Sequence, residues 1–162
     1  MHRWILLSFI LYSYGYTYSQ GNTQYLRWVG DIPASVDADF KICHSESEVI
    51  QYFNTSKGFQ YKGEKAAIEK SFEDMALPSS LNGMIRVRFI VNCKGEAGRF
   101  QLDGWDSEYA PLIINEATAS GFIERLSQLN GWFPLTQRGQ QVDYYLYLTF
   151  QITDGKIIEI LP

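Results

Sequence analysis

The regular alternation of apolar side chains between residues 142 and 152 constrains the fold more than any other feature. Successive side chains of a β-strand point to opposite faces of a sheet, so this pattern predicts a long strand with one buried face. The predicted buried face comprises Val142, Tyr144, Leu146, Leu148, Phe150 and Ile152. The opposite face comprises Asp143, Tyr145, Tyr147, Thr149 and Gln151.

Two hairpins are predicted around this strand. Residues 84–92 alternate in the same way, with Arg86 and Arg88 on the polar face, and a turn containing Gly95 leads to a second strand over residues 98–102. We expect Gly95 to take a positive φ angle, which glycine adopts without a steric penalty. The Asp154-Gly155 pair predicts a turn from the long strand into a short closing strand over residues 157–160.

Helical periodicity predicts two amphipathic helices, over residues 64–75 and 112–129, and Ser45 begins a shorter one that reaches residue 53. The buried stripe expected for the longest helix is Ile113, Ala117, Phe122, Leu126 and Leu129. The order strand, strand, helix, strand, strand, with a helix in front, predicts an α+β fold. We expect a two-layer sandwich, with the helices packed on a small, mostly antiparallel sheet.

The amino terminus has the pattern of a signal peptide over residues 1–19. A short basic region is followed by about ten apolar residues, fewer than the roughly 20 that a membrane-spanning helix needs. Thr17 and Ser19 suit a cleavage site after residue 19. Residues 20–56 are then expected to form a lead-in segment and residues 57–162 the main domain, in a periplasmic or secreted protein. The alternative is an uncleaved segment that tethers the chain to a membrane.

Export would give the two cysteines of the chain, Cys43 and Cys93, an oxidising environment in which a disulfide persists. Such a bond would close a loop of about 50 residues and stabilise the fold by roughly 3–4 kcal/mol. The alternative is a pair of buried free thiols.

Composition and motifs argue against several classes of function. A net charge of −4 provides no basic face for nucleic acid. The chain has no phosphate-binding loop, nucleophile elbow or zinc-protease motif. His44 lies beside Cys43, but one histidine and two distant cysteines do not have metal-ligand spacing. The carboxylates at 103, 106 and 108 are interpreted as a solvated turn. We therefore expect a protein without catalytic activity, cofactor or metal.

The order of these motifs resembles the C-terminal domain of the TonB family. The resemblance covers residues 59–160 and rests on the glycine-led strand from Gly83, the hairpin at Lys94-Gly95 and the Trp132-Phe133-Pro134 segment after the helix. Gly139, Val142 and Phe150 fit the closing strand, and residues 61–72 look like the lead-in helix of related modules in Bacteroidetes-type bacteria. The membrane anchor and proline-rich spacer of a complete TonB are not found in this sequence, which has five prolines.

The resemblance implies that the protein binds a protein or peptide partner by β-strand addition, in which an extended segment pairs with a strand at the edge of a sheet. An outer-membrane transporter segment is the type of partner implied. Residues 142–151 would form the edge, with Asp143, Tyr145, Tyr147, Thr149 and Gln151 on its open face and Arg86 and Arg88 alongside. Two alternatives stay open: a structural accessory subunit of an envelope complex, and a membrane-tethered energy transducer whose amino-terminal segment is not cleaved.

Overall fold

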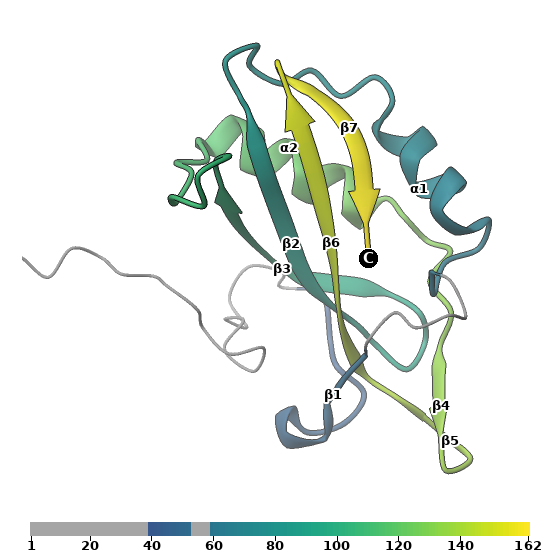
Figure 1. Cartoon of the computed structure of the whole chain (residues 1–162). Helices are drawn as coiled ribbons and strands as arrows, with labels where there is room; N and C mark the ends of the chain where they lie inside the picture. Colours follow the sequence, from purple (N-terminus) through teal and green to yellow (C-terminus); the bar gives the residue numbers. More distant parts are fainter. Residues whose placement is uncertain (1–38, 53–58) are drawn as a thin grey trace, which may run out of the picture.

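The computed structural model describes residues 39–52 and 59–162 (Figure 1). The predicted signal peptide, most of the lead-in segment and the end of the predicted short helix lie outside these residues. Within them, the protein is an α+β domain with one main sheet and two helices.

The main sheet has five strands: β1 (Ile50–Gln51), β2 (Gly83–Val91), β3 (Ala97–Trp105), β6 (Tyr144–Thr153) and β7 (Lys156–Leu161). The order across the sheet is β1-β6-β2-β3, and β7 also pairs with β6. β1 runs parallel to β6, while every other pair in this sheet is antiparallel. The sheet is therefore mixed, and the two predicted hairpins, β2–β3 and β6–β7, are confirmed.

The helices α1 (Glu64–Phe72) and α2 (Glu116–Ser127) share one apolar core with the sheet. The predicted inward positions of β2 and β6 are buried, because alternate residues of both strands face the helices. The largest fully buried side chains include Phe89, Phe122, Tyr144 and Phe150. Figure 1 shows α2 behind the sheet and α1 beside β7.

The first turn predicted for the longer helix is wrong. α2 begins at Glu116, where the Asn115 side chain caps it by accepting a hydrogen bond from the Thr118 N–H at 2.8 Å. Asparagine favours this position because its side chain satisfies an N–H that has no partner inside the helix. Ile113 precedes the helix and is 94% exposed, and Ala117 is also exposed, so neither belongs to the buried stripe. Thr118 takes their place in it.

A small second sheet was not predicted. It consists of β4 (Leu135–Gln137) and β5 (Gln140–Val142), and Val142 pairs with Leu135. The alternating stretch 142–152 is therefore divided at Asp143, between β5 and β6. Four of the residues between 136 and 141 are polar amides or threonine, which gave no strand pattern.

The predicted helix from Ser45 is also wrong beyond its first turn. Residues Glu46–Glu48 form a single 3-10 turn, η2, whose Glu48 carboxylate accepts the Ser45 N–H at 3.0 Å. The chain then extends into β1. Such a short helix is marginal by itself, whereas pairing with β6 satisfies the backbone: the Ile50 N–H donates to the Asp143 carbonyl at 3.0 Å.

The glycines at the ends of β2 fit their surroundings closely. Gly83 has a φ of 130°, and a Cβ there would lie 2.2 Å from the Trp105 carbonyl oxygen. Gly95 has the predicted positive φ, at 84°, and its turn packs against the Trp132 backbone. The β2–β3 turn can approach the Trp132 backbone this closely because residue 95 is glycine.

Candidate functional site

The strand predicted to be the binding edge lies inside the sheet. β6 pairs with β2 along residues Tyr144–Ile152, and on its other side with β1 at one end and β7 at the other. On that side only residues 146–148 have no partner among the described strands, which is too short a stretch to offer a continuous ladder of backbone groups to an extended partner. The prediction of an open edge over residues 142–151 therefore does not hold for the two ends of β6.

Asp143, predicted on the open face of that strand, is fully buried. Its carboxylate accepts backbone hydrogen bonds from Cys43 at 3.0 Å, from His44 at 2.9 Å and from Cys93 at 2.8 Å. The His44 ring Nδ1 lies 3.1 Å from the same carboxylate. Burial alone would raise the pKa of Asp143, but these hydrogen bonds favour the ionised form and lower the pKa below its usual value. Asp143 is a structural residue.

The segment attached by Asp143 covers part of the sheet. Residues 39–52, which we call the strap, are also held by the Cys43–Cys93 disulfide, whose Cα atoms are 6.0 Å apart. The predicted disulfide is confirmed. Arg99 donates to the Glu46 carboxylate at 2.7 Å, and the Asn92 side chain donates to the Lys41 carbonyl at 3.0 Å. The strap is therefore fixed to β2 and β3 as well as to β6.

The strap buries Tyr145, another residue predicted to face a partner. Tyr145 is 6% exposed and forms a small apolar cluster with Ile90. The strap residues Phe40, Ile42 and Val49 pack against this cluster. Here the face of the sheet that is turned away from the helices is already occupied by the chain itself.

The two predicted arginines lie on the same face of the sheet and bind neighbouring side chains. Arg86 makes a bidentate ion pair with Asp103, at 3.0 and 2.9 Å, and its guanidinium lies 4.8 Å from the centre of the Trp105 ring. Arg88 donates to Gln101 at 3.0 Å and is 7% exposed. These contacts tie β2 to β3. The prediction that Asp103 belongs to a solvated turn is wrong, because Asp103 lies within β3, where it pairs with Arg86.

Tyr147, Thr149 and Gln151 complete the predicted set and remain partly exposed on this face. Tyr147 lies opposite Arg88 and Thr149 opposite Arg86. The structure thus brings five of the seven predicted residues onto one face, where Arg88 is buried and the other four are partly exposed: Arg86, Tyr147, Thr149 and Gln151. It places these residues on the face of the sheet and away from an edge.

The edge formed by β7 was not predicted as a site. β7 pairs only with β6, so its outer side has no strand partner among the described residues. A groove of about 690 Å³ follows this strand, between β7 and α1. The partly exposed Met75 and Ile157 contribute apolar surface to it, and Ile158, which is 62% exposed, lies on the strand. We call this feature the β7 groove.

The β3 edge is less accessible. Its far end is occupied by the following loop, because the Leu112 N–H donates to the Gly104 carbonyl at 2.9 Å and Trp105 bridges to Pro111. At its near end Phe40 of the strap packs on Gly98 so closely that a Cβ there would lie 2.2 Å from its ring. Of the β3 and β7 edges, β7 has the freer outer side.

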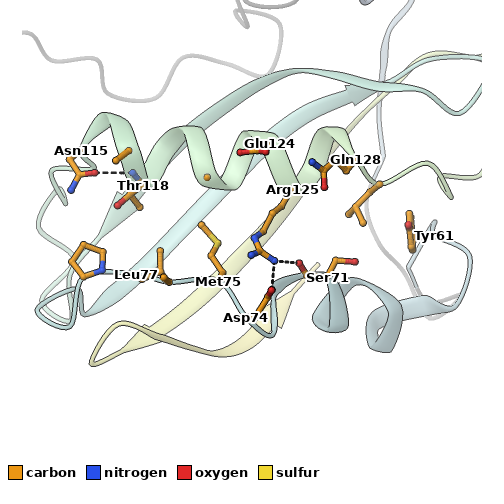
Figure 2. Close-up of a pocket in the computed structure, with 15 residues that line it drawn as sticks. Tyr61, Ser71, Asp74, Met75, Leu77, Asn115, Thr118, Glu124, Arg125 and Gln128 are labelled. Atoms are coloured by element: carbon orange, nitrogen blue, oxygen red, sulfur yellow. Dashed lines mark hydrogen bonds and ion pairs between the residues drawn. The ribbon is translucent and has the colours of Figure 1, made fainter.

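A larger hollow of about 950 Å³ lies between the segment after α1 and α2 (Figure 2). Arg125 spans it, donating to the Asp74 carboxylate and to the Ser71 carbonyl, both at 2.6 Å. The hydrogen bond from Arg125 lowers the pKa of Asp74. Since the charges at its centre are paired across the two elements, this hollow is a contact between helices rather than a set of free reactive groups.

Within the described residues, one group of side chains brings potential metal-ligand atoms close together: Cys43, Cys93 and Asp143. Both sulfurs belong to the disulfide, and the Asp143 oxygens already accept backbone hydrogen bonds. In this state the group holds the fold together and has no ligand atom to offer.

No helix in residues 39–52 and 59–162 combines the length and the apolar character needed to cross a membrane. The site must be interpreted from its own geometry, because no family model, curated protein or solved structure matches the chain.

Proposed function

We propose that this protein is an exported, non-catalytic interaction module that binds an extended protein segment by β-strand addition at the outer edge of β7. The observation that carries the proposal is that β7 pairs on one side only and borders a groove. The outer N–H and C=O groups of an edge strand can bind the backbone of any extended segment. Affinity would therefore come from the backbone of β7.

The β7 groove supports the proposal by offering places for side chains. An added strand directs alternate side chains to opposite faces of the sheet. Those on the helix side would enter the groove, where Met75 provides apolar contact. Glu69 and Lys70 border it on α1, and Glu73 borders it directly after the helix. A segment with an apolar residue at every second position suits this arrangement best.

The resemblance to the TonB C-terminal domain is consistent with this function, with the edge moved from β6 to β7. An outer-membrane transporter segment is the partner that the resemblance suggests. The Cys43–Cys93 disulfide is compatible with an oxidising compartment, as export would require. Tyr147 and Arg86 would lie two and three strands from the bound segment, so their face of the sheet would serve a different contact.

The proposal is tested by a photo-crosslinking amino acid placed at Ile158 of the full chain. Ile158 lies on β7 and is exposed, so an added strand would contact it. We expect irradiation with an envelope extract to give a discrete adduct, identified by mass spectrometry, whose crosslinked peptide is an extended segment of the partner. The same amino acid at Tyr109, which is 76% exposed in the loop after β3, is the matched control. Equal capture at both positions, or capture at Tyr109 alone, would contradict binding at β7.

A further inference from the structure

The sequence of β7 is complementary to itself when two copies run antiparallel. It begins Lys156-Ile157-Ile158-Glu159. In an antiparallel pair centred between the two isoleucines, Lys156 of each copy lies opposite Glu159 of the other, and Ile157 lies opposite Ile158. Opposite charges and β-branched residues are both favourable partners across strands.

A bulge makes the charged pairs geometrically possible. Residues three apart in a regular strand point to opposite faces. In β7, however, Lys156 pairs with Thr153 and Glu159 with Gln151, and the register shifts between them, so that Ile158 has no partner on β6. Thr153 and Gln151 share a face. The bulge therefore brings Lys156 and Glu159 to the same face, where each can contact its counterpart in a second copy.

The charges around Glu159 leave room for another cation. Lys65 of α1 lies 3.6 Å from Glu69 and 3.3 Å from Glu159. One ammonium thus serves two carboxylates. Lys156 from a second copy, arriving opposite Glu159, would place a second cation beside this carboxylate, and Lys156 is exposed in the single chain.

We propose that two copies of this chain associate through their β7 strands, forming one continuous antiparallel sheet around a twofold axis between Ile157 and Ile158. The contact is isologous, since the same strand is used by both copies, and it closes as a dimer. It also buries Ile158, one of the large apolar side chains that the single chain exposes. The interface is short, so the dimer dissociates readily.

The dimer occupies the edge to which the proposed function assigns the partner segment. A partner segment and a second copy then compete for β7, and the dimer cannot bind the partner segment at this edge. The inference does not depend on the proposed function: a chain that never dimerises could still bind a peptide at β7, and a dimer could form in a protein that binds nothing else.

Sedimentation velocity of the purified full chain over an about hundredfold range of concentration tests the proposal. We expect a shift from monomer to dimer as concentration rises. Lys156→Glu and Glu159→Lys should each raise the dissociation constant about tenfold, because each places two like-charged pairs in the interface. The double variant Lys156→Glu/Glu159→Lys restores opposite charges and should return towards the wild-type value.

Two further variants separate the interface from general effects. Lys94→Glu changes the net charge as Lys156→Glu does, but at an exposed residue of the β2–β3 turn, and it should leave the dimer unchanged. Ile158→Ser leaves both charges and the Lys65 contact intact, and should weaken the dimer about tenfold. Circular dichroism verifies that each variant is folded. A wild-type chain that stays monomeric throughout, or folded single variants that dimerise as well as wild type, would overturn the proposal, and an unrestored double variant would overturn its register.

Discussion

Asp143 shows how one residue can be given the wrong role by a correct pattern. It alternates with the buried positions of the strand, so the sequence places it on a polar face. In the structure it lies at the break between β5 and β6. Its carboxylate accepts hydrogen bonds from three backbone N–H groups, which belong to segments on both sides of the disulfide. Those donors come from residues 50 and 100 positions away, which no local period can indicate.

Replacing Asp143 by asparagine should destabilise the protein strongly. An amide keeps one acceptor oxygen but turns an NH₂ group towards buried N–H donors, which leaves them without partners. We expect a loss of roughly 3 kcal/mol in the free energy of unfolding, measured by chemical denaturation. Asp154→Asn, at an exposed turn, is the control and should change little. A stable Asp143→Asn protein would show that the carboxylate does not organise the strap.

The pH dependence of stability should change in the same variant. The pKa of Asp143 is lower in the folded protein than its ordinary value, near 3.8. The ionised carboxylate therefore stabilises the fold fully at pH values above this ordinary pKa. This contribution is lost as the pH falls below that value and through the lower pKa of the folded state. Wild-type unfolding free energy should therefore decline more steeply in this acidic range than that of Asp143→Asn. Parallel acid profiles would contradict the assignment.

At the scale of elements, the sequence predicts what short-range periodicity determines. The alternation of β2 and β6 and their buried faces are confirmed, and α1 and α2 are found within their predicted ranges. The elements that were not predicted depend on contacts between segments far apart in the sequence or have no apolar pattern. β1 is a strand because β6 is available to pair with it, and the β4–β5 hairpin is polar apart from the Leu135–Val142 pair.

Gly121 offers a test of how tightly α2 packs. It lies inside the helix, where alanine is more favourable by about 0.5–1 kcal/mol. A Cβ added there would lie 3.1 Å from the end of the Met75 side chain, which is flexible enough to move. We expect Gly121→Ala to raise the midpoint of denaturant unfolding. The gain should be at least as large in a Met75→Ala background, and a destabilised Gly121→Ala would mean that Met75 cannot shift.

At the scale of the whole molecule, the candidate site could not be located from the sequence because it depends on strand order. The disulfide and the shared face of Arg86, Arg88, Tyr147, Thr149 and Gln151 could be predicted, since both follow from composition and strand period. Which strands lie at the edges depends on how distant segments pair. β6 has the strongest strand pattern and is central, whereas the shorter β7 has the free side.

The disulfide connects the strap to the rest of the molecule, and removing it should weaken the whole fold. It closes a loop between residues 50 positions apart, so the double variant Cys43→Ser/Cys93→Ser should lose roughly 3–4 kcal/mol of unfolding free energy. Chemical denaturation of wild type with and without a reductant should show a similar loss. The serine variant should not respond to the reductant. A serine variant as stable as oxidised wild type would show that the strap is held by its other contacts alone.

The separation of Asp143 from the strap also sets an order of events when the chain enters an oxidising compartment. If the chain enters amino terminus first, Cys43 and Cys93 are both available, with the β2–β3 hairpin, before Asp143 and β6 arrive. The strap can thus be joined covalently to the half-built sheet while the place of β6 is still empty. The last long strand to be synthesised must then enter between β2 and a segment that is already attached beside it.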